Sequence, residues 1–290
     1  MSEPSPKPRQ SPRRPTGPPV ARPVVPATSA HHAPTCELFG LKLSALTHDD
    51  VVRLVADHLQ APPGRGSLTL DATNTHGMAA SCKSRKLHRS MSMYDHLLPD
   101  GMPLVWCMNA KGADLPTSVA GPHLIQNVLA GLPRRTKIAV IGGHGDMHRQ
   151  VVEVSREHFP MAHFVLLYDV PYRPIDRAYV DDCLHRIEDS GADLVFVCLG
   201  VPRQCHWTAL AKPILGDRVS ISVGGAFAYI SGEAVAPPAW MQRAGLWWLH
   251  RLYKEPRRLW KRYFVFNSLF LWYLLTKEIL PGKFRRRRCL

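Results

Sequence analysis

Two short apolar runs that each end at glycine constrain the fold of this chain most strongly. The first, residues 193–199, leads into Gly200-Val201-Pro202-Arg203-Gln204, and the second ends in Val223-Gly224-Gly225. β-branched and aromatic residues favour strands, and glycine at the carboxyl end of a buried parallel strand lets the backbone approach a ligand closely. Two such endings close together predict a nucleotide or sugar site at the carboxyl edge of an α/β sheet.

The middle of the chain alternates between strand and helix patterns. Thr47-His-Asp-Asp50 has the form of a capping box, and apolar residues follow it at helical spacing to Leu59. This order predicts an α/β fold, a Rossmann-like and mainly parallel sheet with helices on both faces, in one domain over residues 36–239. We expect strands at 67–70, 137–141, 163–168, 193–199 and 219–223, and helices at 47–59, 145–158, 175–189 and 203–215.

Charge is concentrated at the two ends. The whole chain has a net charge of +14, to which residues 240–290 contribute +11 and residues 1–35 contribute +4. The intervening 204 residues are therefore near −1. This distribution argues against a nucleic-acid-binding domain and favours basic ends that meet an anionic surface, such as phospholipid headgroups or a diphosphate.

The amino-terminal segment and the cysteines indicate the cellular compartment of the protein. Residues 1–35 hold ten prolines and no apolar periodicity, so we expect a disordered Pro/Arg-rich tail. That tail has no apolar core of the kind found in secretory signals. The seven cysteines include no Cys-x-x-Cys pair, which favours a reducing cytosol with no disulfide framework and no zinc site.

Residues 240–290, here called the appendage, combine basic and aromatic residues. The stretch 259–280 is rich in Trp, Tyr and Phe but is broken by Asn267 and Ser268, so it predicts an interfacial helix better than a membrane span. Arg285–Arg288 adds charge for anionic lipid. The alternative is an ordinary core-packing helix with a solvated tail.

A second glycine cluster has two interpretations. Gly142-Gly143-His144-Gly145 follows a strand and precedes a helix, so it is either a phosphate-binding turn or simply a tight connection. It does not have the G-x-G-x-x-G form, which weighs against a nicotinamide-dependent oxidoreductase.

Several motifs occur in a fixed order along the chain. They are Asn74, Leu98-Pro-Asp100-Gly101, Val119-Ala-Gly121, Val140-Ile-Gly-Gly143, Leu199-Gly-Val-Pro-Arg-Gln204, Val223-Gly-Gly-Ala-Phe227, Gly232, Ala236-Pro237, Gly245–Arg251 and Glu255-Pro-Arg-Arg258. Together they resemble the WecG/TagA/CpsF glycosyltransferases, which add a sugar to a polyprenyl-diphosphate-linked acceptor in bacterial surface-polysaccharide synthesis. The resemblance runs from about residue 36 to 275.

The resemblance implies an inverting transfer in which Asp100 is the catalytic base. One carboxylate takes the proton from the acceptor hydroxyl as that oxygen attacks the anomeric carbon. Without the resemblance, Asp100-Gly101 would be read as a turn. The expected substrate-binding residues are Thr73, Asn74, Gly142, Gly143, Gly200, Pro202, Gln204, Gly224, Gly225, Arg251, Arg258 and Arg262.

The resemblance also implies the partners. We expect a UDP-hexose donor, a lipid-diphosphate-linked saccharide acceptor, and a peripheral position on the cytoplasmic face of the cell membrane, in exopolysaccharide or cell-surface polysaccharide synthesis. No Asp-x-Asp motif occurs, and we expect no metal or cofactor, with arginines of the appendage holding the diphosphate instead. The sugar, the acceptor saccharide and the oligomeric state are left open.

The chain departs from the family pattern at four positions, Ala72, Cys205, Val235 and Trp247. Relatives have Thr, Glu, Arg and Glu there, respectively. These replacements predict either a changed sugar or weakened activity. The second possibility leaves an alternative function open, a catalytically impaired relative that acts as a membrane-attached partner in polysaccharide assembly.

Overall fold

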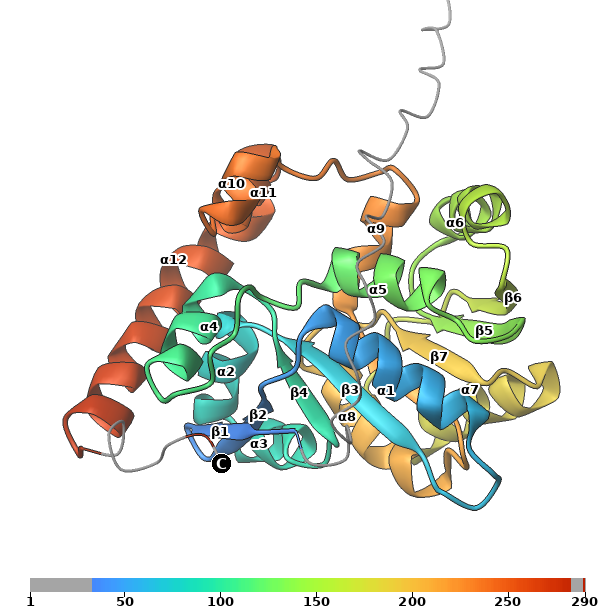
Figure 1. The fold of residues 1–290 in the computed structure, drawn as a ribbon, viewed down its shortest axis with the longest axis horizontal. Coiled ribbons are helices and arrows are strands. Elements are labelled where there is room, and N and C mark those ends of the chain that lie inside the picture. Colours follow the sequence, from blue (N-terminus) through green and yellow to red (C-terminus); the bar gives the residue numbers. More distant parts are fainter. Residues whose placement is uncertain (1–32, 283–288, 290) are drawn as a thin grey trace, which may run out of the picture.

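A computed structural model describes residues 33–282 and residue 289. Its eight strands form one sheet in the spatial order β1-β2-β4-β3-β8-β7-β5-β6 (Figure 1). β1 runs antiparallel to β2, and the other neighbouring pairs are parallel, which confirms the predicted α/β fold. The strands are β1 (Thr35–Leu38), β2 (Leu41–Ser44), β3 (Leu68–Thr73), β4 (His96–Pro99), β5 (Thr136–Ile141), β6 (Ala162–Tyr168), β7 (Leu194–Val197) and β8 (Val219–Ser222).

The helices follow the predicted alternation through most of the α/β domain. Thr47 caps the first helix, and the reciprocal bonds of the capping box are both formed with Asp50. The helices are α1 (His48–Gln60), α2 (Thr75–Lys83), α3 (Arg85–Met91), α4 (Met102–Asn109), α5 (Gly121–Ala130), α6 (Gly145–His158), α7 (Arg177–Ser190), α8 (Arg203–Ala211), α9 (Phe227–Ile230), α10 (Ala239–Arg243), α11 (Trp247–Lys254) and α12 (Pro256–Tyr273), with a π-helical turn at Leu274–Ile279.

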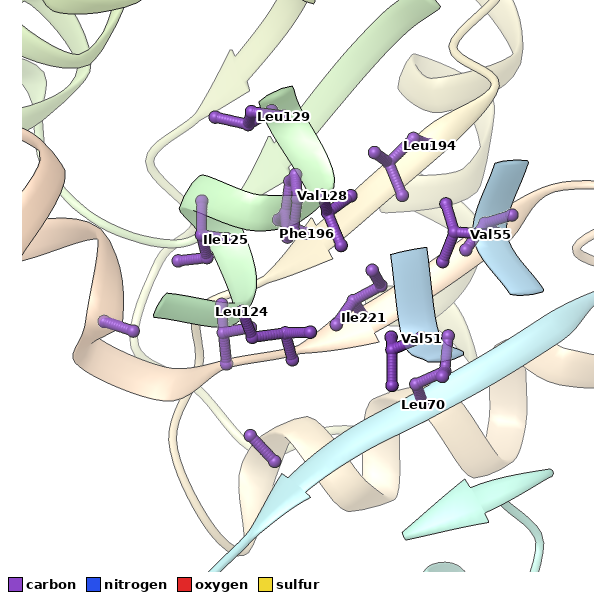
Figure 2. Close-up of a cluster of buried hydrophobic side chains, with 14 of the residues drawn as sticks. Val51, Val55, Leu70, Leu124, Ile125, Val128, Leu129, Leu194, Phe196 and Ile221 are labelled. Carbon is purple, nitrogen blue, oxygen red and sulfur yellow. The ribbon is translucent and has the colours of Figure 1, made fainter. Parts of the chain in front are cut away.

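Both faces of the sheet are buried, as the continuous apolar run of β7 requires. In β7, Leu194 and Phe196 face the core that α1 and α5 cover, which Figure 2 shows in close-up. Val195 and Val197 face the opposite core, under α7 and α8. A third cluster lies where α2, α3 and α4 cover β1, β2 and β4. Helices thus pack on both faces of the sheet and fix the position of its carboxyl edge.

The appendage is part of this fold. α12 packs along α2 in Figure 1, and Phe270 is only 2% exposed within the third cluster. Beyond α12, Glu278 forms a buried ion pair with Lys111, at 3.0 Å, and accepts a hydrogen bond from the backbone N–H of Phe39, at 2.8 Å. The far end of the appendage is therefore fixed to α4 and to the hairpin of β1 and β2.

One expectation about the cysteines is wrong. Cys36 of β1 and Cys289 form a disulfide, although the sequence predicted none. The two residues are 253 positions apart, and their pairing depends on the appendage returning to β1, which cysteine spacing does not reveal. The other cysteines, Cys82, Cys107, Cys183, Cys198 and Cys205, are free thiols.

Candidate active site

The predicted site residues gather at the carboxyl edge because their strands are neighbours. β3 lies between β4 and β8, and β7 lies beside β8. Asp100 follows β4, and its backbone N–H donates to the carbonyl oxygen of Thr73 at 2.7 Å. A Cβ atom added to Gly224 would lie 4.0 Å from the Cα atom of Gly200. The sheet therefore brings together residues as far apart in the sequence as Thr73 and Gly224.

Asp100 lies between β4 and α4 and is half-buried. Gly101 follows it with a φ of 112°, a backbone conformation that only glycine adopts readily, and α4 begins at the next residue. The strand and the helix on either side of Asp100 fix its backbone, and its half-buried position leaves part of the residue exposed. Its role as catalytic base stays a prediction.

Asn74 and Thr73 have structural partners. The side-chain oxygen of Asn74 caps α2 by accepting a hydrogen bond from the N–H of Gly77 at 3.1 Å. Thr73 is 2% exposed, and its hydroxyl donates to Asp71 in the interior of the sheet. Substrate contacts at these two residues stay predictions.

Gly200, Gly224 and Gly225 form what we call the glycine cradle. Gly200 and Gly224 have φ values of +69° and +56°, in the left-handed region that favours glycine. A Cβ atom added to Gly200 or Gly225 would meet nothing within 4 Å, so their backbone faces open space. Pro202 follows the cradle through a cis Val201–Pro202 peptide bond and is exposed.

Gly142 and Gly143 differ from the cradle because the protein itself fills the space beside them. A Cβ atom on Gly142 would lie 2.9 Å from the carbonyl oxygen of Cys198, and one on Gly143 would lie 2.1 Å from Cε of Met147. His148 Nε2 also lies 2.9 Å from the carbonyl oxygen of Gly142. A tight turn accounts for both glycines, and their contact with a ligand stays a prediction.

Gln204 lies directly behind the cradle and belongs to a buried polar network that the sequence did not predict. Its Nε2 atom donates to Oδ1 of Asp71 at 2.8 Å. Nearby, the hydroxyl groups of Tyr94 and Ser222 are hydrogen-bonded at 2.8 Å. Burial raises the pKa of Asp71 to about 6, while hydrogen bonds from Thr73 and Gln204 act in the opposite direction. The available signal for Asp71 was a lone carboxylate in an otherwise uncharged strand.

The appendage contacts elements on both sides of this edge. On one side, Trp247 of α11 donates to the hydroxyl of Tyr229 at 3.2 Å and stacks edge-on against His123. On the other side, Thr75 Oγ1 donates to Asn267 of α12 at 2.8 Å. Because Tyr229 follows the cradle in α9 and Thr75 begins α2, the two contacts bracket the carboxyl edge.

The three predicted arginines all belong to these appendage helices. The guanidinium carbon of Arg251 lies 5.8 Å from the centre of the Tyr229 ring, which places this charge beside α9. Arg258 and Arg262 belong to α12, but their side chains lie outside the part of the structure that is described. Their role toward a diphosphate stays a prediction.

The outward face of the appendage is rich in exposed apolar side chains. Phe264, Leu271 and Trp272 are 62%, 63% and 60% exposed, respectively. Within residues 33–282, no helix combines the length and the apolar character needed to cross a bilayer.

In the same range, no three His, Cys, Asp or Glu side chains are grouped as metal ligands, and metal independence stays a prediction.

The sequence model of the glycosyl transferase WecG/TagA/CpsF family matches residues 36–283, which is most of the chain. The chain belongs to the WecG/TagA/CpsF family. It is therefore a glycosyltransferase, as the resemblance predicted. Asp100, the glycine cradle and residues 240–283 of the appendage lie inside the region that matches this family.

Two curated WecG/TagA/CpsF relatives carry the same name, N-acetylglucosaminyldiphosphoundecaprenol N-acetyl-beta-D-mannosaminyltransferase. The protein from Bacillus subtilis (strain 168) is 28% identical over 187 residues, which cover 63% of this chain and 70% of the relative. The protein from Bacillus spizizenii (strain ATCC 23059 / NRRL B-14472 / W23) is 28% identical over 173 residues, covering 59% and 65%. The similarity thus leaves about a third of each relative unmatched.

The four departures from the pattern of the WecG/TagA/CpsF family lie in different surroundings. Ala72 is buried in the core on the opposite side of β3 from Asp71, and Cys205 is fully buried beside Tyr94 and Asp71. Val235 is 64% exposed. Trp247 is the residue that joins α11 to Tyr229 and His123. Only Trp247 therefore takes part in fastening the appendage.

Proposed function

We propose that this glycosyltransferase moves a hexose from a UDP-sugar to polyprenyl-diphosphate-linked N-acetylglucosamine. The acceptor is proposed from the names of both relatives, which act on N-acetylglucosaminyldiphosphoundecaprenol. The product would serve the synthesis of an exopolysaccharide or another cell-surface polysaccharide.

The observation that carries this proposal is the half-buried Asp100 at the carboxyl edge, next to β3 and two residues before Met102, which Gly245 of the appendage approaches. Asp100 takes the proton from the acceptor hydroxyl while that oxygen forms a bond to the anomeric carbon. The bond from the anomeric carbon to the diphosphate oxygen breaks on the opposite side. UDP leaves with the bonding electron pair, and the configuration of the sugar is inverted.

The leaving diphosphate needs positive charge, because it departs carrying more negative charge than it had in the donor. Arg251 supplies a guanidinium group beside α9, and Arg258 and Arg262 follow on α12. Guanidinium groups match phosphate oxygens in geometry and stay charged at any physiological pH. In this proposal the reaction proceeds without a metal ion.

The appendage also holds the enzyme at the cytoplasmic face of the membrane, where a polyprenyl acceptor is anchored. Exposed Phe264, Leu271 and Trp272 supply an apolar contribution to binding, and the net charge of +11 over residues 240–290 supplies an electrostatic one. In this proposal, residues 36–239 form the domain that transfers the sugar. The appendage binds the membrane and also contributes part of the active site.

The catalytically impaired relative remains the second candidate, because Cys205, Val235 and Trp247 replace charged residues of the family pattern. A donor screen separates the two. The full chain in detergent is incubated with a short-chain polyprenyl-diphosphate-N-acetylglucosamine and, in turn, a panel of UDP-hexoses and UDP-N-acetylhexosamines. The panel begins with UDP-N-acetylmannosamine, since the relatives transfer N-acetylmannosamine.

The proposal expects one donor to give a disaccharide lipid, with inverted anomeric configuration by NMR. If no donor reacts, while the protein still binds acceptor vesicles, the result supports the impaired relative instead. A retained anomeric configuration would remove Asp100 from the role of general base in a single displacement.

A further inference from the structure

The proposed mechanism does not use the most deeply buried carboxylate of the sheet. Asp71 is 1% exposed in β3, where it pairs with Leu97 of β4 and Ser222 of β8. Its oxygens accept hydrogen bonds from Gln204 and Thr73. An ionised carboxylate is costly to bury, so one that persists under a functional edge needs an explanation beyond packing.

The charge of Asp71 fixes the direction of the Gln204 amide. An ionised carboxylate has acceptors only, so the NH₂ group of Gln204 must face it and the carbonyl oxygen Oε1 must face away. That oxygen is buried and has no hydrogen-bond partner among the described residues. It lies 3.6 Å from the position that a Cβ atom would take on Gly224. Gln204 thus turns an unused acceptor toward the glycine cradle.

We propose that Asp71 is a positioning residue, which holds Gln204 so that the glycine cradle receives a hydroxyl or N–H group of the sugar nucleotide rather than its diphosphate. This inference rests on the proposed function and deepens it. Phosphate oxygens are acceptors, and the Gln204 oxygen repels them. A ribose or hexose hydroxyl, or an N–H of the base, supplies the missing hydrogen, directly or through one ordered water.

The replacement Asp71→Asn tests this assignment with almost no change in shape. An asparagine amide both donates and accepts, so Gln204 can then turn either way and its oxygen is no longer held toward the cradle. The matched control is Ser220→Ala, which removes a fully buried hydroxyl from neighbouring β8 that has no partner among the described residues.

The measurement is a double-mutant cycle on the KM for the donor. Loss of one hydrogen bond predicts a rise of about tenfold for Asp71→Asn and for Gln204→Ala, with a smaller change in kcat and none for Ser220→Ala. Because Asp71 acts through Gln204, the double variant should resemble Gln204→Ala alone. Additive effects, or a wild-type KM in a folded Asp71→Asn protein, would overturn the proposal.

A second readout does not require turnover and so separates this inference from the proposed function. The side-chain amide signal of Gln204 in nitrogen-15 NMR, identified by its loss in Gln204→Ala, should shift as Asp71 ionises near its pKa of about 6 and should stay fixed in Asp71→Asn. Burial raises the pKa values of the neighbouring Tyr94 and Cys205 well above this range, so neither contributes. An unmoved signal in the wild-type protein overturns the inference, whereas a shifting signal without any turnover counts only against the proposed function.

Discussion

Asp100 is a residue whose two interpretations, turn and base, make different predictions. Asp100→Asn keeps the shape of the side chain and removes its ability to accept a proton. We expect kcat to fall roughly 100- to 10,000-fold, the usual contribution of a general base, while the melting temperature stays unchanged. Steady-state kinetics on the donor found in the screen measures the effect.

The control for Asp100 is the same replacement at Asp114, an exposed residue with a φ of 55° that asparagine tolerates well. Asp114→Asn should leave kcat unchanged. Near-normal turnover of Asp100→Asn would show that Asp100 is a turn residue and not the catalytic base.

Asp71 should make stability depend on pH. Burial raises its pKa from 3.8 to about 6, although hydrogen bonds from Thr73 and Gln204 lower it. A carboxyl group with a higher pKa in the folded state stabilises the fold below the unfolded pKa, and this contribution is lost as the pH rises through the folded pKa. The rise corresponds to about 3 kcal/mol at most.

We therefore expect the unfolding free energy of Asp71→Asn, minus that of the wild-type protein, to increase between about pH 4 and pH 7. Urea unfolding at several pH values gives this difference directly. A difference that is constant with pH would show that Asp71 titrates normally, and the buried carboxylate would then not be under electrostatic strain.

At the scale of elements, the ion pair of Lys111 and Glu278 joins the turn after α4 to the far end of the appendage. Both side chains are almost fully buried, at 1% and 5% exposure. Lys111→Met leaves the buried Glu278 carboxylate without a countercharge, so we expect a loss of about 3–5 kcal/mol in the free energy of unfolding. Replacing both residues with methionine should cost less than Lys111→Met alone.

The control is Arg177→Met, which breaks an exposed pair with Asp181 within α7. That change should cost about 0.5 kcal/mol or less. Equal losses for Lys111→Met and Arg177→Met in denaturant unfolding would mean that the appendage contributes no stability through this contact.

The elements also show what a sequence can predict. β5 and β7 were predicted to within a few residues because each contains a continuous apolar run, as burial on both faces demands. The hairpin of β1 and β2 was missed because Phe39, not glycine or asparagine, occupies the first turn position, with a φ of 54°. β4 is four residues long and ends in proline, which leaves no periodic pattern.

The candidate site could be predicted only in part, because some of its contacts depend on the order of the strands in the sheet. Asp100, Gly200 and Gly224 each follow a strand, and the ends of parallel strands share one edge whatever the strand order. The contact of Asp71 with Gln204, 133 positions away, depends on the order in which the strands assemble, which the local pattern does not contain.

At the scale of the whole molecule, charge and exposed apolar surface coincide on the appendage. We expect the protein to sediment with anionic vesicles, less so as salt rises and screens the charges, and to bind neutral vesicles weakly. Replacing Phe264, Leu271 and Trp272 together with serine should lower the bound fraction at least tenfold, since each loses its apolar contact with lipid.

Ile214, an exposed apolar residue remote from the appendage in sequence, provides the control, and Ile214→Ser should sediment like the wild-type protein. Equal sedimentation of all variants would contradict a membrane role for this face. Substitution is preferable to truncation after residue 239, because truncation also removes Phe270 from the core cluster that it completes.

The hydrogen bond from Phe39 to Glu278 has a consequence for folding during synthesis on the ribosome. The two residues are 239 positions apart, so a ribosome needs roughly 10 to 50 s to deliver the second after the first. Once β8 has been synthesised, and until Glu278 follows, the nascent α/β domain has all of its strands but lacks the partner of Lys111 and the apolar cover of α2. The nascent chain therefore exposes the apolar surface that the appendage later covers. A chaperone that binds apolar surface can bind there until the appendage has been synthesised.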